Sequence, residues 1–186
     1  RAAADAASEL AERLGDPELL AMAAHDRGQV ALVGGDFAGA AQLLRAALCG
    51  TAMISRPLTR LARAEALARA GRPEEAQAEL RETVLEPVRH SDFPETLVPR
   101  LARVQGLVAL QAGDHALAVR RLEEAAAGWR SQVSRLTRGE SLTAVLTDLG
   151  RPVVGLIEPE RELERAQREL DTLKAARQGV PHAVVS

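Results

Sequence analysis

The side chains best able to do chemistry in this sequence are four histidines and a single cysteine. His90 and Asp92 stand two residues apart and could share a metal ion, but no second pair of ligands accompanies them. We therefore interpret them as a solvated pair in a connecting loop. Cys49 has no histidine or lysine nearby in the sequence to activate its thiol, so we expect a small buried residue at the end of a helix. A reactive thiol is the alternative.

The motifs that assemble common active sites are missing from the sequence. There is no HExxH zinc motif, no glycine-rich loop followed by lysine to cradle a phosphate, and no nucleophile elbow. The acidic pairs Glu74/Glu75 and Glu123/Glu124 fit a helix start and a solvent-facing helix side. The sequence therefore predicts no catalytic residue, no metal site and no cofactor, and it does not predict an enzyme.

The composition favours closely packed helices. Hydrophobic residues make up 46% of the 186 residues, yet aromatic residues make up only 2% and tyrosine is absent. A core of alanine and leucine suits helices that cross at short distance, whereas sheets draw on β-branched and aromatic residues. The sequence therefore predicts an all-α chain, long enough for one domain or a short repeat array.

Charge and hydropathy disfavour two classes of partner. The 24 basic and 26 acidic residues nearly balance, so nothing draws the whole chain toward nucleic acid or an anionic membrane. No uncharged apolar run approaches the roughly 20 residues that span a bilayer, and no signal peptide opens the chain, so we expect a cytoplasmic protein without membrane association. One stretch is locally basic, but acidic residues interrupt it and one tryptophan accompanies it, which favours a solvated helix side over direct nucleic-acid binding. Its arginines are Arg120, Arg121, Arg130, Arg135 and Arg138.

Three similar phrases recur along the chain: GDFAGAAQLLRAAL at 35–48, GRPEEAQAELRETV at 71–84 and GDHALAVRRLEEAA at 113–126. Each begins with glycine and a turn or cap residue, and each has alanine at its sixth place and leucine at its tenth. The successive glycines are 36 and 42 residues apart, a period typical of helical solenoids. We predict helical hairpins over about 17–49, 56–86 and 94–129, preceded by a partial repeat over 1–15.

Prolines and capping residues predict where the helices begin. Asp16 followed by Pro17 fits an N-cap with a proline in the first turn, where its missing N–H is not needed. Pro94 fits a first turn in the same way, but Pro99 would then lie further inside that helix. Either the helix starts late or it kinks at Pro99.

At these positions the sequence resembles the tetratricopeptide repeat (TPR). That family places a small residue in the first helix of each hairpin, and a small, a large apolar and a second small residue in the second helix. The matching residues are Gly28, Ala64 and Gly106, followed by Ala40/Leu44/Ala47, Ala76/Leu80/Thr83 and Ala118/Leu122/Ala125. The resemblance implies a TPR-like α-solenoid over residues 1–130, a right-handed superhelix of antiparallel hairpins. Helices would approach closely at the small residues, and large residues would fill the gaps between hairpins.

The sequence departs from the family in its irregular repeat lengths and at its aromatic positions. Those positions hold Ala24, Arg60, Ala102, Ala31, Leu67 and Ala109. In this respect the sequence is similar to the degenerate repeat arrays of large bacterial transcription regulators, such as the maltose-regulon-activator type and multidomain regulators with an ATPase module. The opening RAAADAASEL has no methionine and is already helical in pattern, so we expect a piece of such a longer protein.

The resemblance also implies a binding face, because the first helices of such hairpins line the concave side of the array. Arginines on that face could receive a carboxylate or a phosphate. The residues of this predicted face are Met22, His25, Gln29, Glu65, Arg69, Arg100, Arg103 and Leu107. The carboxylate clamp of co-chaperone members needs asparagines, and the sequence contains none, so that class of partner is disfavoured.

Residues 131–178 are expected to form C-terminal helices that pack on the array or cap it, and 179–186 a frayed end. One more helix should follow over about 130–149, and another should run from Pro159 to about Arg177. Leu156, just before the second of these helices, and Leu163 and Leu170 within it stand seven residues apart and would make a helix–helix contact. We interpret the stripe as the packing side of a capping helix. A short dimeric coiled coil is the alternative.

Together these features predict a non-catalytic protein-interaction or sensor domain of a larger bacterial transcription regulator. Its partner would be a protein, a peptide or another domain of the same full-length chain. The alternative is a free-standing TPR-like scaffold or dimerisation protein, in which the chain forms a homodimer.

Overall fold

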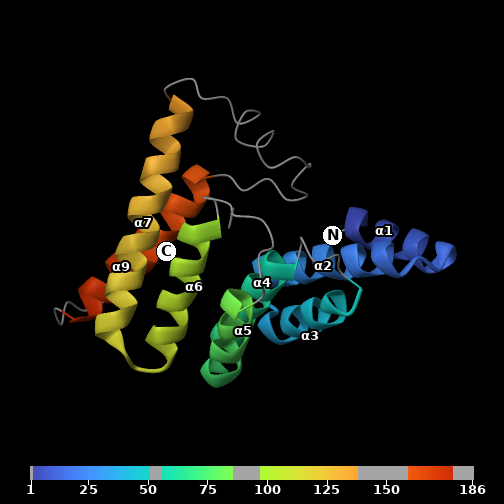
Figure 1. The fold of residues 1–186 in the computed structure, drawn as a ribbon, viewed down its shortest axis with the longest axis horizontal. Helices are drawn as coiled ribbons and strands as arrows, with labels where there is room; N and C mark the ends of the chain where they lie inside the picture. Colours follow the sequence, from blue (N-terminus) through green and yellow to red (C-terminus); the bar gives the residue numbers. More distant parts are fainter. Residues whose placement is uncertain (1, 51–55, 86–96, 138–158, 178–186) are drawn as a thin grey trace. The chain divides into compact units, whose positions relative to one another are not determined.

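The computed structural model describes residues 2–50, 56–85, 97–137 and 159–177. Throughout these stretches the elements are α-helices, and none of them contains a strand, so the described part of the chain is all-α as predicted. The helices of Figure 1 are α1 (Ala2–Leu14), α2 (Pro17–Val33), α3 (Phe37–Leu48), α4 (Arg56–Arg69), α5 (Pro73–Leu85), α6 (Leu97–Gln111), α7 (His115–Thr137) and α9 (Pro159–Arg177).

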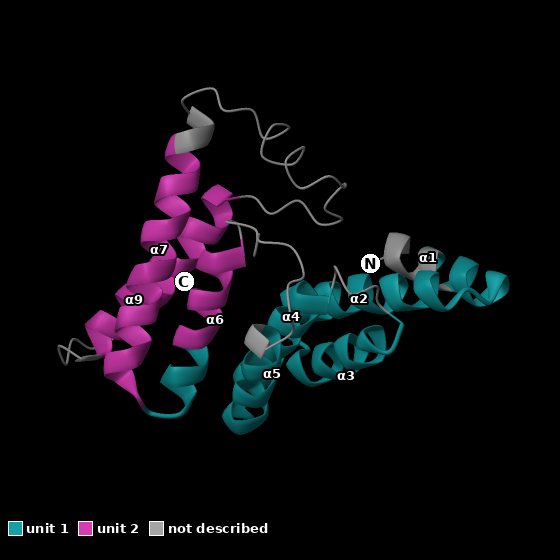
Figure 2. Ribbon diagram, in the orientation of Figure 1, with its two compact units in different colours: residues 1–87, 107–113 teal, residues 88–106, 114–186 magenta. Residues whose placement is uncertain are grey.

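The chain divides into two compact units (Figure 2). Unit 1 comprises residues 1–87 and 107–113, and unit 2 comprises residues 88–106 and 114–186. In unit 1, α2 packs on α3 and α4 packs on α5, while α1 lies against α2 and α3 lies against α4. In unit 2, α9 packs along α7. The boundary between the two units falls inside α6: residues 97–106 belong to unit 2, and residues 107–111 belong to unit 1.

The turn between α2 and α3 shows how the repeated phrase is built. Gly35 has a φ of 83°, a left-handed conformation that glycine adopts without a steric penalty, and it ends α2. The carboxylate of Asp36 then accepts a hydrogen bond from the N–H of Gly39 at 2.9 Å and caps α3. The same arrangement recurs at Gly113, with a φ of 82°, and at Asp114. The predicted sequence of a helix stop followed by a cap is confirmed.

Replacing Asp36 by alanine is expected to lower the free energy of unfolding by about 1 kcal/mol, because the N–H of Gly39 loses its acceptor at the first turn of α3. Urea unfolding followed by circular dichroism measures the change. Asparagine at position 36 keeps a side-chain acceptor and should retain most of the stability. An equal loss in both variants would contradict the capping explanation and would point to the charge of Asp36 instead.

The helix limits resolve the two alternatives at Pro99. Helix α6 begins at Leu97, so Pro99 lies in its first turn, where no backbone hydrogen bond is lost. The helix therefore starts late, as one of the alternatives predicted. Helix α9 runs from Pro159 to Arg177 as expected. Helix α7 runs from His115 to Thr137 as one helix, so the further helix predicted over 130–149 does not begin at residue 130. The rest of that range lies outside the described residues, as does the tail from residue 179.

Small and large residues at the repeat positions meet inside a hairpin, whereas the resemblance implied that the large residues fill the gaps between hairpins. Leu44 of α3 is fully buried, and a Cβ added to Gly28 would lie only 2.7 Å from its Cγ. Helices α2 and α3 can therefore approach this closely only because residue 28 has no side chain. In unit 2, a Cβ on Gly106 would lie 2.9 Å from Cγ of Leu122, which is also fully buried. The same packing solution therefore occurs in both units.

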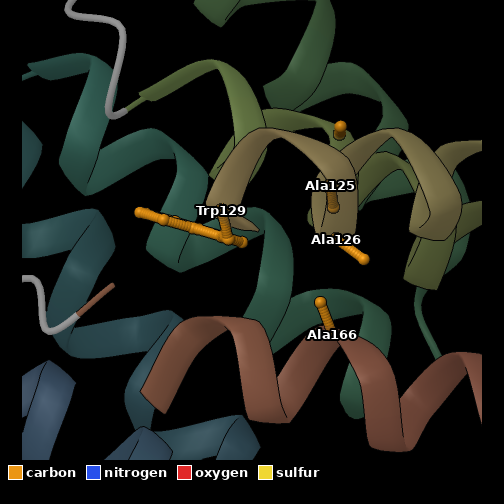
Figure 3. Packing of buried hydrophobic residues seen from close by; sticks show 5 residues of the cluster. Ala125, Ala126, Trp129 and Ala166 are labelled. Atoms are coloured by element: carbon orange, nitrogen blue, oxygen red, sulfur yellow. The ribbon is translucent and has the colours of Figure 1, made fainter. Parts of the chain in front are cut away.

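The core of unit 2 is built from small side chains around one tryptophan. Ala125, Ala126 and Trp129 of α7 are fully buried, and Ala166 of α9 faces them across the helix pair (Figure 3). The ring of Pro99 packs directly against Gly128. A Cβ at residue 128 would lie 2.6 Å from Cγ of Pro99, so the ring fits because residue 128 has no side chain. Since the chain contains a single tryptophan, its fluorescence reports on unit 2 alone.

Candidate functional site

The predicted face of unit 1 lies on α2 and α4, which contact each other. His25 Nδ1 of α2 lies 3.0 Å from Thr59 Oγ1 of α4, and Gln29 Nε2 lies 3.3 Å from His25 Nε2. Because an amide nitrogen donates, His25 Nε2 accepts from Gln29, and the Nδ1–H of His25 donates to Thr59. Thr59 is fully buried. The polar atoms of His25 therefore join two helices.

Arg69 is held at the surface of unit 1 by two contacts. Its Nε lies 3.1 Å from Oε1 of Glu65, a buried carboxylate one turn earlier on α4. Its guanidinium carbon also lies 5.9 Å from the centre of the Phe37 ring on α3, within reach of a cation–π interaction. Arg69 therefore balances the buried charge of Glu65, while part of its side chain remains open to solvent.

Arg103 of α6 is fully buried in unit 2, between two carboxylates of α9. Its Nη1 donates to Oε1 of Glu169 at 3.1 Å, and its Nε lies 3.5 Å from Oε2 of Glu162. The second approach is an ion pair without a hydrogen bond, since neither of those two atoms has a hydrogen-bond partner in the described structure. Helix α9 therefore engages this predicted binding residue from within the same chain. Arg100 is half-buried, and Leu107 is 7% exposed.

The leucines predicted to make a helix–helix contact lie on α9, which packs on α7. Leu170 is 2% exposed, and Leu163 is half-buried against the cluster around Trp129. Leu156 lies outside the described residues. Leu163 and Leu170 thus serve packing inside unit 2, within their own chain.

The apolar side chains that remain exposed gather on the first two helices. Of the eight large hydrophobic residues that are exposed in the described part of the chain, seven lie on α1 or α2. Met22, a residue of the predicted face, is 42% exposed. It lies in a row, called the α2 stripe below, whose members are Leu19, Met22, Val30 and Val33. Their separations of three, eight and three residues keep them on one side of a helix with about 3.6 residues per turn.

Sequence reasoning missed the partners of the buried charges. Thr59 gave no signal, because a single threonine in an amphipathic helix is ordinary. Glu162 and Glu169 did carry a signal, since they stand seven residues apart and each neighbours a residue of the leucine stripe. Carboxylates at that spacing lie on one side of a helix and beside its packing face, where they can receive a buried arginine.

Two of the residues that suggested chemistry, Cys49 and His115, are described and lie at the surface. Cys49 is exposed, so the prediction of a buried cysteine is wrong. It is the C-cap of α3, two residues past the buried Ala47, and therefore lies off the packed side of that helix. His115 is exposed as expected, whereas His90, Asp92 and His182 lie outside the described residues.

Among the described residues, no group of three or more histidine, cysteine, aspartate or glutamate side chains lies close enough together to hold a metal ion. None of the described helices combines the length and the apolar character needed to cross a membrane. No protein-family model, no curated protein and no solved structure matches this chain.

Proposed function

We propose that this chain is a non-catalytic protein-interaction domain that binds a protein partner through the α2 stripe. The observation that carries the proposal is the exposure of its four members: 37% for Leu19, 42% for Met22, 39% for Val30 and 77% for Val33. Scattered apolar residues are normal on a protein surface, but a row on one side of one helix is typical of a surface that another protein covers.

The use of the polar side chains supports recognition rather than catalysis. His25 bonds to Thr59, Glu65 is paired with Arg69, and Arg103 lies between carboxylates of α9. Each contact joins helices or balances a buried charge. These groups fix the shape of the scaffold, and the exposed apolar side chains supply the area that a partner can bury.

The architecture and context that we propose are those implied by the sequence resemblance. The hairpins would stack as a TPR-like right-handed superhelix, and the chain would form part of a larger cytoplasmic transcription regulator in bacteria. The repeated fit of glycine against leucine at equivalent positions in both units supports the stacked-hairpin architecture. The partner would then be another protein, or another domain of the full-length regulator.

A photo-crosslinking residue at position 33 tests this function in the cells that make the protein. The matched control carries the same residue at position 82, an exposed glutamate of α5. We expect a heterologous adduct from position 33 alone. The partner identified in it should then bind the purified wild-type chain, and the Met22→Glu/Val33→Glu variant should bind it at least about a hundredfold more weakly, because two buried apolar contacts become buried charges.

Two results would overturn the proposal. Adducts of equal yield from both positions would show that the α2 stripe has no special role. If the chain crosslinks only to itself, the α2 stripe is the contact of a homodimer, as in the scaffold alternative, and no other protein covers it. Sedimentation of the double variant would then show a loss of the dimer.

A further inference from the structure

The α2 stripe has an aspartate at its centre. Asp26 lies four residues after Met22 and four residues before Val30, in the middle of the gap of eight residues within the row. Side chains four residues apart lie one above the other on the same side of a helix. The outer members, Leu19 and Val33, each stand seven residues from Asp26, which is close to two turns of the helix. The stripe is therefore an apolar surface with one negative charge in its middle.

Helix α2 supplies no counterion for this charge. The positions one turn before and one turn after Asp26 hold Met22, Ala23, Gln29 and Val30. The Asp26 carboxylate is half-buried, and it makes no ion pair or hydrogen bond with the described residues of the chain. A partner that covers the stripe removes more water from this carboxylate, and a charge that is buried without a counterion weakens binding. A partner that binds tightly must therefore bring a cation to residue 26.

A second copy of the chain does not bring that cation with its own α2 stripe. A two-fold dimer uses the same surface of both copies. If two α2 helices align their stripes in antiparallel directions, Leu19 faces Val33 and Met22 faces Val30, so Asp26 faces the Asp26 of the other copy. If the helices run parallel and in register, every residue again faces its own equivalent. Both arrangements bring two carboxylates together, and like charges across an interface disfavour association.

We propose that the α2 stripe binds a different protein, which presents an apolar surface interrupted by one arginine or lysine, and that this cation pairs with Asp26. The proposal rests on the proposed function, since Asp26 selects a partner only if the stripe binds one. The apolar members of the stripe supply the area that is buried, and the ion pair fixes the register of the two surfaces. The unpaired carboxylate also rejects apolar surfaces that have no cation at the matching place.

The protein found in the adduct from position 33 is the probe for this proposal, and it is titrated with the purified chain. Asp26→Asn keeps the size of the side chain and removes its charge. It should weaken binding at least about tenfold, because the cation of the partner is then buried without a counterion. The matched control is Glu82→Gln, which removes an exposed carboxylate of α5 and should bind as the wild type does. Circular dichroism checks that both variants keep their helices.

An exchange of charges identifies the cation and separates pairing from a purely structural role of Asp26. The arginines and lysines in the bound region of the partner are changed to glutamate one at a time. One of these variants should bind the Asp26→Arg chain at least about tenfold more tightly than it binds the wild-type chain, because the ion pair is restored in reverse. A structural role of Asp26 would give no such rescue. In sedimentation, the wild-type chain alone should be a monomer.

The possible failures of the two proposals can be told apart. If a partner binds the stripe but Asp26→Asn binds it as tightly as the wild type, or if no charge exchange restores binding, the role of Asp26 is refuted and the proposed function stands. A wild-type dimer that Met22→Glu/Val33→Glu dissociates would also refute the selection of a different protein. If position 33 gives no more heterologous adduct than position 82, the proposed function is wrong and this proposal falls with it.

Discussion

Replacing Arg103 by methionine is expected to lower the free energy of unfolding of unit 2 by about 3–5 kcal/mol. The arginine is fully buried, whereas the side chains of Glu162 and Glu169 are 19% and 16% exposed. Without the guanidinium, the two carboxylates lose their buried counterion while still largely shielded from water, although Glu162 keeps its approach to Arg165 at 3.7 Å. The fluorescence of Trp129 reports the unfolding of unit 2 in urea, because no other tryptophan is present.

Two matched variants separate the loss of a buried charge from the loss of an ordinary arginine. Arg121→Met removes an arginine of α7 whose side chain is 35% exposed and paired with Glu124, and it should change stability by no more than about 0.5 kcal/mol. Changing Glu162 and Glu169 to glutamine in the Arg103→Met background should recover much of the loss, because the two groups that faced the buried guanidinium are then neutral. If Arg103→Met alone lowers the free energy of unfolding by less than about 1 kcal/mol, this prediction is wrong. Water would then reach the two carboxylates, and the ion pairs would contribute little to the packing of α9.

The elements that depend on local chemistry could be predicted from the sequence. Gly35 and Asp36 act within one turn of themselves, so a glycine stop and an aspartate cap are visible without knowledge of the fold. The resemblance also implied the close approach of two helices at Gly28. It placed Leu44 in the gap between hairpins, however, and the structure places this leucine against Gly28 within one hairpin.

The contacts that depend on distant partners could not be predicted. Arg103 lies 66 residues before Glu169, and nothing local shows which helix covers it. The sequence therefore placed Arg103 on an open binding face, while the structure places it under α9. The error at Cys49 has a different origin. Its residue type favours burial, but its position at the end of α3 turns it away from the packed side. Residue preference is weaker than helix phase at such a position.

A double-mutant cycle between positions 28 and 44 is expected to show strong non-additivity. Leu44→Ala should cost about 2–5 kcal/mol, because it leaves a cavity in a fully buried site. Gly28→Ala should cost about 1–3 kcal/mol through overpacking, partly offset by the better helix propensity of alanine. The added methyl would meet Leu44 Cγ at 2.7 Å and Cδ2 at 2.9 Å, and Leu44→Ala removes both of those atoms. The double variant should therefore be more stable than the sum of the single effects predicts, by about 1–2 kcal/mol.

The equivalent pair in unit 2 and a crossed pair supply the controls. Gly106→Ala and Leu122→Ala should couple in the same direction, because the added methyl would lie 2.9 Å from Cγ of Leu122. Gly28→Ala combined with Leu122→Ala joins positions from different units and should be additive within about 0.5 kcal/mol. Circular dichroism reports the helices of both units during urea unfolding, and Trp129 fluorescence reports unit 2 alone, so a transition seen only by circular dichroism is that of unit 1. Additivity within both equivalent pairs would contradict the view that one packing rule, a missing side chain opposite a leucine, sets the helix spacing in both units.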